Sequence, residues 1–498
     1  MSDENGVWRC RVCGYIHHGT QPPDSCPICG APASDFEASE QPAPKAAQQA
    51  PGSWRCLNCS YVHTGAAPPD ECPVCGARHD RFVPAPEDGA QAEGGYTGRI
   101  AVLGAGIAGV AAVEAIARVA PAAQVSLIGA EDELPYYRLN LTRYLAGAQD
   151  RAALHLHPRS WYDERGIALR LGTPVSSIDA ADKQLRFADD ETLAWDRLVL
   201  AAGAHPFVPP IPGNELAGVH CIRTIADVEA VRERCDAATR CVCIGGGILG
   251  MEVAAALAAQ GAQVELLESH GWLMPRQLDR RAGALLQEHA AGMGITTINA
   301  ARVAEIRGSQ EVREVVLADG ASHPADLVTL TTGVRPNTHL ARRIGLDVRR
   351  GVVVDNHMRS SQPDIYAAGD IAEHAGTVYG LWTPAQSMGA IAGMNAAGAA
   401  AEFGGIPRSN TVKVIGADVF SIGTIEPEDG SYRVIAGEDG GVYRRFVVRD
   451  GCLVGAVLFG ASELAAAVRI AVEEGLDVAP ALSKEDAGEL ASFLAERA

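Results

Sequence analysis

The chain has 498 residues, of which 47% are hydrophobic and 21% are charged, which is typical of globular proteins and argues against disorder, coiled coil and collagen. With 61 acidic and 42 basic residues the formal net charge is −19. This charge excludes nucleic-acid binding through the overall electrostatic field, because phosphate would be repelled over most of the surface.

At roughly 150 residues per domain, the length predicts about three domains. The sequence shows no secretory signal and no run of apolar residues long enough to span a bilayer, so we expect a cytoplasmic protein that binds no membrane. In that reducing compartment, the eight clustered cysteines among the 13 in the chain are expected to be metal ligands or redox groups and not structural disulfides.

A duplicated cysteine module opens the chain, and its two copies are offset by 46 residues. Each copy holds two Cys-x-x-Cys motifs, whose four thiolates suit a tetrahedral zinc or iron ion. So small a module needs such a metal to fold. The modules are predicted at 1–38 and 54–84, with Ala- and Pro-rich linkers at 39–53 and 85–98. The predicted metal ligands are Cys10, Cys13, Cys26, Cys29, Cys56, Cys59, Cys72 and Cys75.

From residue 99 onward, short apolar strands alternate with helical stretches, as in α/β folds. A Gly-x-Gly-x-x-Gly loop joins a predicted strand at Ile100–Leu103 to a helix at Val110–Val119, and an acidic residue follows a second strand at Gln124–Ile128. Such glycines let a pyrophosphate approach the helix N-terminus, and the acid can bind a ribose hydroxyl. The predicted dinucleotide ligands are Gly104, Gly106, Gly109 and Glu131.

The same arrangement recurs with strands at Cys241–Ile244 and Gln263–Leu267 and a helix at Met251–Ala259. An acid after the second strand repels a 2′-phosphate, which favours NADH over NADPH. Two dinucleotide sites in one chain suit a permanently bound FAD and an exchanging nicotinamide. The ligands predicted for the second site are Gly245, Gly247, Gly250 and Glu268.

The end of the chain is predicted to be rich in strands, followed by helices. The expected fold class is α/β: a flavoprotein with Rossmann-like FAD and NAD domains, two small N-terminal four-cysteine metal modules and a C-terminal α+β domain. The FAD-binding domain is expected in two parts, at 99–223 and 343–407, around an NAD-binding domain at 224–342, with the C-terminal domain at 408–498. The C-terminal strands are expected at Val412–Ile415, Val419–Ile422, Val442–Val448 and Leu453–Phe459.

The N-terminal modules carry more specific sequence signals than their cysteine spacing. The strings Trp8-Arg-Cys-Arg-Val-Cys-Gly-Tyr15 and Cys26-Pro-Ile-Cys-Gly30, with the trailing Phe36, resemble the short rubredoxin domain at the end of rubrerythrins. The resemblance covers residues 8–37 and 54–83 and implies one redox-active iron in each module. From spacing alone, a zinc ribbon remains the alternative.

Four later motifs begin at Leu134-Pro-Tyr, Asp196-Arg-Leu, Thr332-Gly-Val and Ile365-Tyr-Ala. With the glycine loops, they resemble the FAD- and NAD(P)H-dependent pyridine nucleotide oxidoreductases, especially NADH:rubredoxin reductases and the flavin half of the nitrite reductase large subunit. The resemblance spans Arg99–Ala401. Further cofactor-binding residues that it implies are Arg138, Gly203, Gly333, Asp370 beside the ribityl or phosphate part of FAD, and Trp382 beside the isoalloxazine.

Two residues are candidates for catalysis by the same resemblance. Glu252 follows the second glycine loop in the family's Gly-x-Glu arrangement, and Arg143 stands where related flavoproteins often carry a lysine. We predict that they form an ion pair that orients hydride transfer from nicotinamide to flavin. The alternative is a buried structural salt bridge plus a surface arginine.

Disulfide reductases of this superfamily place two cysteines against the flavin, but residues 99–220 contain none. Cys241 and Cys243 are expected in the core, and Cys221, Cys235 and Cys452 are expected to be inert. Electrons are therefore expected to leave the flavin without passing through a disulfide.

The resemblance implies an NAD(P)H-dependent FAD oxidoreductase of the rubredoxin reductase type. It would pass electrons from NADH through the flavin to the rubredoxin-type iron centres and on to an external acceptor protein. That acceptor is unknown; by analogy it is rubrerythrin-like or another oxygen-detoxifying protein, and the oligomeric state stays open. The alternatives are a flavoprotein reductase with zinc-ribbon interaction modules, and an NADH oxidase or redox sensor.

Overall fold

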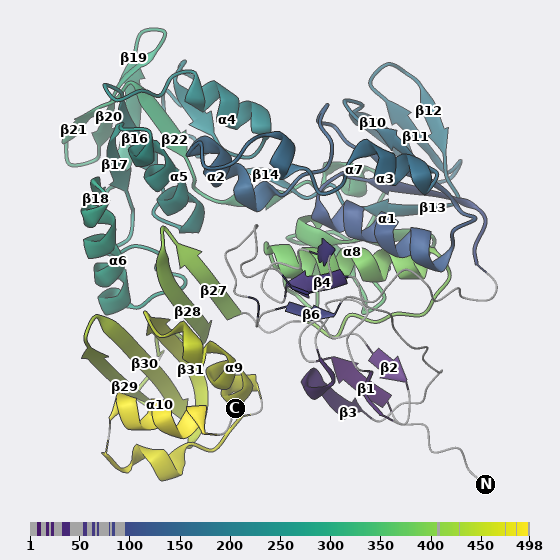
Figure 1. The fold of residues 1–498 in the computed structure, drawn as a ribbon. Coiled ribbons are helices and arrows are strands. Elements are labelled where there is room, and N and C mark those ends of the chain that lie inside the picture. The colour runs from purple at the N-terminus through teal and green to yellow at the C-terminus, as the bar shows by residue number, and fades with distance from the viewer. Residues whose placement is uncertain are drawn as a thin grey trace. The chain divides into compact units, whose positions relative to one another are not determined.

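The computed structural model (Figure 1) describes 95–405, 409–427, 429–473, 475–484 and 486–496 and, before them, only 7–10, 16–18, 21–23, 32–39, 53–56, 62–64, 67–68, 79 and 82–84. Over these residues, no helix has the length and apolar character needed to cross a membrane. Contacts divide the chain into two units. The first comprises Met1–Asn140, Arg151–His205 and Arg335–Ile406, and the second comprises Leu141–Asp150, Pro206–Val334 and Pro407–Ala498.

The first unit is built around a parallel five-stranded sheet of order β25-β13-β7-β8-β9. Apolar strands buried on both faces are typical of parallel sheets covered by helices, and Ala101, Val102 and Leu103 are buried accordingly. A small antiparallel sheet, β10-β11-β12, accompanies it. The strands are β7 (Arg99–Leu103), β8 (Gln124–Ile128), β9 (Ile167–Arg170), β10 (Val175–Asp179), β11 (Gln184–Phe187), β12 (Thr192–Ala194), β13 (Arg197–Leu200) and β25 (Ile365–Ala367).

Two helices of this unit pack unusually closely: α1 (Ile107–Val119), which joins β7 to β8, and α8 (Trp382–Ala396). They lie side by side in Figure 1. A Cβ atom on Gly389 would lie 2.1 Å from the Ala108 carbonyl oxygen, and one on Gly393 would lie 2.3 Å from the Ala112 carbonyl oxygen. Glycine is therefore required at both α8 positions, because any side chain would push the helices apart.

The second unit repeats this plan. Its parallel sheet has the order β15-β22-β16-β17-β18, and the antiparallel sheet β19-β20-β21 accompanies it. Helix α5 (Ile248–Ala259) joins β16 to β17 as α1 joins β7 to β8. The remaining elements are α2 (Leu141–Leu145), β15 (Val219–Cys221), α4 (Ile225–Arg232), β16 (Arg240–Ile244), β17 (Gln263–Leu267), α6 (Arg280–Gly292), β18 (Ile295–Ile298), β19 (Val303–Gly308), β20 (Val312–Leu317), β21 (Ser322–Pro324) and β22 (Leu327–Leu330).

An ion pair at the start of each sheet marks the repeat. Arg99 begins β7 and pairs with Asp196 with an Nη2–Oδ1 distance of 2.8 Å. Arg240 begins β16 and pairs with Asp326 at 2.6 Å, again through two side-chain hydrogen bonds. Hydrogen bonds from these arginines hold the pKa of each aspartate at about 2.

The C-terminal part of the second unit is an antiparallel sheet of order β27-β28-β31-β30-β29, against which α9 (Ala465–Glu473) and α10 (Ala487–Ala495) pack (Figure 1). Four of its strands were predicted, and β29 was not. The fold class is therefore α/β with a C-terminal α+β part, as predicted. The strands are β27 (Ser409–Val414), β28 (Ala417–Gly423), β29 (Tyr432–Asp439), β30 (Val442–Arg449) and β31 (Cys452–Phe459).

This C-terminal part is fastened to helix α6 of the same unit. Asp279 caps the N-terminus of α6 and is buried, and its Oδ2 accepts a hydrogen bond from Tyr443 Oη at 2.9 Å. Two residues after Asp279, Arg281 donates two hydrogen bonds of 2.8 Å to the carboxylate of Glu438, the residue opposite Tyr443 in the sheet. One buried hydrogen bond and one exposed ion pair thus join the start of α6 to the C-terminal sheet.

The described parts of the two N-terminal modules have the same strand pairing. In the first, β1 (Val7–Cys10) lies between β2 (Ile16–His18) and β3 (Phe36–Ser39), and in the second β4 (Ser53–Cys56) lies between β5 (Val62–Thr64) and β6 (Phe82–Pro84). Cys10 pairs with Phe36, and Cys56 pairs with Phe82. The backbone register therefore repeats as the sequence does. The other six predicted ligands, Cys13, Cys26, Cys29, Cys59, Cys72 and Cys75, lie outside the described residues.

Candidate dinucleotide-binding sites

Each glycine of the first loop has a separate steric reason to be glycine. Gly104 has a φ of +120°, and a Cβ there would lie 2.1 Å from the Ala201 carbonyl oxygen. A Cβ on Gly109 would lie 1.8 Å from the Gly104 carbonyl oxygen. A Cβ on Gly106, by contrast, meets nothing within 4 Å. The first and third glycines are therefore required by packing, and the second leaves space in front of the N-terminus of α1 for a bound group.

A polar network lies after β8. Glu131 accepts hydrogen bonds from Tyr136 Oη at 2.7 Å and from Arg138 Nη2 at 2.8 Å. Burial alone would lower the pKa of Arg138, but its interactions with Tyr136, Glu131 and Asp370 raise that pKa above its ordinary value. Three residues predicted separately as FAD ligands, Glu131, Arg138 and Asp370, are thus brought together. A ribose hydroxyl would have to share the Glu131 carboxylate with these two protein donors.

The predicted isoalloxazine contact, Trp382, begins helix α8. Its ring stacks on Tyr137, with a centroid distance of 5.5 Å and an interplanar angle of 22°. Gly369 precedes Asp370 with a φ of +78°, and a Cβ there would lie 2.8 Å from Ala108 Cβ at the start of α1. The aromatic pair, the Asp370 loop and the first glycine loop therefore meet at one edge of the parallel sheet, where open α/β sheets bind their ligands.

The second glycine loop reproduces the first in detail. Gly245 has a φ of +115°, and a Cβ there would lie 2.7 Å from the Thr331 carbonyl oxygen. A Cβ on Gly250 would lie 1.8 Å from the Gly245 carbonyl oxygen, whereas a Cβ on Gly247 meets nothing within 4 Å. The N-terminus of α5 therefore presents the same open approach for a phosphate group.

Glu268 is buried and tied to this second loop. Its Oε2 accepts from the Gly246 amide at 2.8 Å, and its Oε1 accepts from the His270 amide at 2.8 Å and from Ser269 Oγ at 3.1 Å. Burial alone would raise the pKa of Glu268, but hydrogen bonds from His270, Gly246 and Ser269 lower it below its ordinary value. The carboxylate is thus kept charged beside the second glycine loop.

Two more predicted glycines occupy corresponding places in the two units. Gly203 follows β13 with a φ of +63°, and Gly333 follows β22 with a φ of +107°. A Cβ on Gly333 meets no atom within 4 Å. The positive φ explains why glycine is needed at each turn, and the open space at Gly333 is compatible with a ligand.

The catalytic pair differs from the prediction. Glu252 lies on α5, and its Oε2 accepts a hydrogen bond from Thr142 Oγ1 at 3.1 Å. Burial raises the pKa of Glu252 to about 7, and the Thr142 bond partly opposes this. Arg143, the next residue of α2, has an exposed side chain, and within the described residues it makes no ion pair with Glu252. The expected ion pair is therefore wrong. The sequence pointed to Arg143, whereas its neighbour Thr142 makes the contact. Adjacent side chains of the short helix α2 lie on different faces, so only one of the two can point toward Glu252.

The cysteines outside the modules are all free thiols. Cys241 and Cys243 are buried in β16, as predicted, and Cys221, Cys235 and Cys452 are partly buried. Burial raises the pKa of Cys243 to about 12, because the thiolate would lose its hydration. Within the described residues no disulfide is formed, and no group of three or more potential metal-ligating side chains is found.

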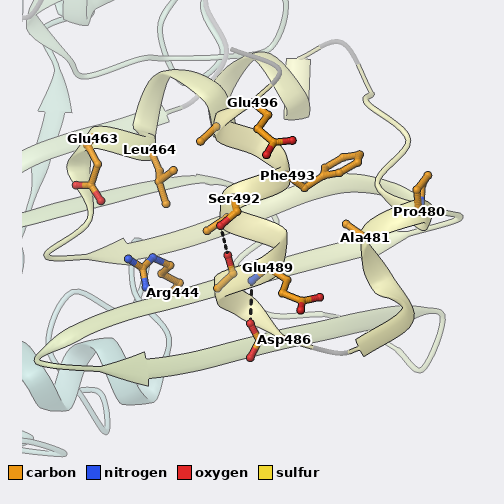
Figure 2. Close-up of a pocket in the computed structure, with 13 residues that line it drawn as sticks. Arg444, Glu463, Leu464, Pro480, Ala481, Asp486, Glu489, Ser492, Phe493 and Glu496 are labelled. Carbon is orange, nitrogen blue, oxygen red and sulfur yellow. Dashed lines mark hydrogen bonds between the residues drawn. The ribbon is translucent and has the colours of Figure 1, made fainter.

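Figure 2 shows a further hollow, of about 770 Å³, in the C-terminal part. Asp486 accepts a hydrogen bond from the Glu489 amide at 2.8 Å, and Ser492 Oγ donates to the Gly488 carbonyl at 3.0 Å. Both bonds hold the turns of α10 itself. None of the predicted site residues lines this hollow, so we assign it no role.

Comparison with known protein families identifies three regions. Residues 98–389 match the family described as pyridine nucleotide-disulphide oxidoreductase. Residues 8–37 and 54–83 match the rubredoxin-like domain of rubrerythrin. Residues 409–476 match the C-terminal domain of rubredoxin NAD+ reductase. The family resemblances predicted from the sequence motifs are therefore confirmed.

Individual relatives agree with this. The chain is 33% identical over 365 residues to an assimilatory nitrate reductase electron transfer subunit of Bacillus subtilis, covering 73% of this chain and 47% of that protein. It is 36% identical over 274 residues to the ferredoxin–NAD(+) reductase component of a biphenyl dioxygenase system from Paraburkholderia xenovorans, covering 55% and 67%. The chain thus spans less than half the length of its nitrate and nitrite reductase relatives.

Among solved structures, the NADH:rubredoxin oxidoreductase of Clostridium acetobutylicum superimposes with a TM-score of 0.69 at 25% identity, covering 80% of this chain and all of that one. A putidaredoxin reductase, solved in covalent complex with putidaredoxin, gives a TM-score of 0.70 at 25% identity, covering 80% and 99%. The family implies FAD, NAD(H) and rubredoxin-like metal sites, and the glycine loops described above fit the two dinucleotides.

Proposed function

Because the chain belongs to the pyridine nucleotide-disulphide oxidoreductase family, we propose that it carries electrons from NADH, through FAD, to its own rubredoxin-type iron centres and on to an external acceptor protein. One observation carries the proposal. Two dinucleotide-type glycine loops, two rubredoxin-like modules and a rubredoxin reductase C-terminal domain occur together in a single chain.

Bound FAD supplies the step between a two-electron hydride donor and one-electron acceptors. The chain's part is to hold the two nucleotides. Gly106 and the N-terminus of α1 would receive the pyrophosphate of FAD, with Asp370 and Trp382 beyond it along the dinucleotide. Gly247 and the N-terminus of α5 would receive the pyrophosphate of NADH. The charged Glu268 favours NADH over NADPH by repelling a 2′-phosphate.

We propose Glu252 as the residue that sets the pH dependence of NADH-driven flavin reduction. Its pKa of about 7 places its charge change within the physiological range. Thr142, as the donor that holds the carboxylate, replaces Arg143 as its partner in this role.

Iron, and not zinc, is the metal that this function needs in the four-cysteine modules, since zinc has no redox chemistry. Tethering the modules to the reductase raises their effective concentration at the flavin. This matters for a chain of net charge −19, which gains no electrostatic attraction for an acidic carrier. We further propose that the protein acts in the cytoplasm and that its acceptor is rubrerythrin-like.

The test is metal analysis of full-length protein purified without oxygen, combined with absorption spectra before and after NADH. We expect iron in both modules and bleaching of its visible band by NADH. Cys29→Ser and Cys75→Ser, one ligand lost from each module, serve as matched controls that show which module contributes. Zinc in the modules, or an iron band that NADH leaves unchanged, would overturn the proposal and favour a flavoprotein with zinc-ribbon interaction modules.

A further inference from the structure

Two buried side-chain amides in the first unit lack hydrogen-bond partners. Asn140 is 1% exposed and Gln386 is 7% exposed. Among the described residues, the side-chain Nδ2 and Oδ1 atoms of Asn140 have no hydrogen-bond partner. The Oε1 atom of Gln386 also has none. Burying an unpaired amide costs about 1–3 kcal/mol in proteins. Two such groups in one unit therefore indicate that something else satisfies them.

The position of Gln386 on α8 shows which region it faces. Trp382, Gln386, Gly389 and Gly393 are spaced i, i+4, i+7 and i+11 and so form one stripe along the helix. The two glycines of that stripe pack on Ala108 and Ala112, in ascending order along both helices, so α8 and α1 run in the same direction.

The stripe on α8 extends beyond the N-terminal end of α1, the helix that it packs against. Helix α1 begins at Ile107, one residue before the contact with Gly389. Gln386 lies about 4.5 Å and Trp382 about 10 Å farther along the axis, at 1.5 Å per residue. The first two turns of α8 therefore extend beyond the N-terminus of α1, where the loop glycine Gly106 leaves space. Trp382 Nε1 is likewise buried without a partner.

Asn140 reaches the same region from another part of the chain. It ends the short turn Arg138–Asn140, and its backbone N–H donates to the Tyr137 carbonyl at 3.0 Å. Tyr137 stacks on Trp382, and Arg138 binds Glu131. The turn is thus held between the start of α8 and the polar network after β8.

A second buried amide on α8 shows that an unpaired amide is not the rule here. Asn395 donates to the carbonyls of His357 at 2.9 Å and Ala401 at 2.8 Å, and its Oδ1 accepts from the Ala401 amide at 3.0 Å. Near the C-terminal end of α8, protein groups thus provide all the hydrogen-bond partners of the buried Asn395 amide. Of the three amides compared, Asn140, Gln386 and Asn395, the two without partners are the ones toward the end of the unit where the glycine loop opens.

We propose that the side-chain amides of Asn140 and Gln386 bind the flavin end of FAD. The pyrimidine edge of the isoalloxazine offers alternating hydrogen-bond donors and acceptors, and the ribityl chain offers hydroxyls. A carboxamide carries both a donor and an acceptor, so it can pair with either, and Trp382 Nε1 adds a further donor. The inference rests on the proposed function only in taking FAD as the bound flavin.

The test compares Asn140→Leu and Gln386→Leu with Asn395→Leu in the full-length protein. FAD dissociation constants are measured by fluorescence titration of flavin-free protein, and melting temperatures are measured with and without FAD. Each of the first two variants is expected to bind FAD roughly 3- to 10-fold more weakly, as loss of one hydrogen bond implies. Their flavin-free forms are expected to be no less stable than wild type, because no protein partner is lost.

Asn395→Leu has the opposite expectation. It breaks three protein hydrogen bonds, so it should lower the flavin-free melting temperature while leaving the FAD dissociation constant within about twofold of wild type. The midpoint potential of the flavin provides an independent readout, since a tenfold change in the two-electron equilibrium is about 30 mV. We expect a shift of that order for at least one of the first two variants. If either leucine variant does not fold, the alanine variant is used.

Unchanged FAD affinity and unchanged potential in both Asn140→Leu and Gln386→Leu would overturn the inference and assign the amides to buried water. Failure of the proposed function is distinguishable, because wild-type protein would then bind no FAD or show no reduction by NADH. Reduced stability of the flavin-free Asn140 and Gln386 variants to the level of Asn395→Leu would also contradict the inference, since it would reveal protein partners for these amides.

Discussion

Replacing Glu252 by glutamine is expected to stabilise the protein at neutral and alkaline pH and to flatten its pH dependence. Burial raises the pKa of Glu252 from 4.5 to about 7 in the folded chain, and unfolding restores the ordinary value. Between these two values the folded state binds the proton more tightly. The stability that this proton contributes to the folded state is therefore fully present below about pH 4.5 and is lost as the pH rises through about 7.

The difference between 4.5 and about 7 corresponds to at most about 3 kcal/mol of stability lost by about pH 8. Glutamine keeps the shape and still accepts the hydrogen bond from Thr142, but it carries no charge. Thermal denaturation of Glu252→Gln between about pH 5 and about pH 8 should therefore lack this loss. Thr142→Val, which removes the hydrogen bond that lowers the pKa of Glu252, should instead make the total loss larger and extend it to higher pH.

Glu215→Gln is the matched control, because Glu215 is an exposed glutamate of the same unit. It should retain the wild-type pH dependence. If Glu252→Gln melts with the same dependence on pH as wild type, Glu252 does not titrate near neutrality, and its proposed role in the pH profile of flavin reduction fails with it.

The other predictions concern substitutions at three single positions. Gly106→Ala should fold and lose FAD affinity, because its Cβ meets no protein atom within 4 Å, whereas Gly109→Ala should not fold, because its Cβ would lie 1.8 Å from the Gly104 carbonyl oxygen. FAD content and circular dichroism distinguish these outcomes, and a Gly106→Ala protein with full FAD affinity would contradict the first. Tyr443→Phe should cost about 1–3 kcal/mol in chemical denaturation, because it leaves the buried Asp279 carboxylate without its 2.9 Å donor; unchanged stability would show that this bond contributes nothing.

The strands of the nucleotide-binding folds were predictable because their chemistry is local. β8 and β17 have the predicted bounds, Gln124–Ile128 and Gln263–Leu267, since apolar residues on either side of one polar residue give the alternation of a strand. The helices that follow the glycine loops begin three residues earlier than predicted, at Ile107 and Ile248. The second glycine of each loop serves as the N-cap, so part of what reads as loop is already helix.

Features that depend on distant contacts were not predictable. Strand β29 has Ile435 as its one buried residue, because it lies at the edge of its sheet, and its sequence gives little alternation to detect. The partner of Glu252 lies 110 residues away in sequence, so only the fold could distinguish Thr142 from Arg143. The unpaired amides of Asn140 and Gln386 leave no sequence signal, since an unsatisfied hydrogen bond is a property of the surroundings.

The glycine contact between α1 and α8 also constrains the order of folding during synthesis. The two helices are separated by roughly 260 residues of sequence, which a ribosome takes on the order of tens of seconds to add. All strands of the β15–β18 and β22 sheet are translated within that interval. The nucleotide-binding fold of the second unit can therefore form on the nascent chain while α1 still exposes its Ala-rich face. Completion of the first unit waits for α8, because α1 has no glycine stripe to pack against until that helix is translated.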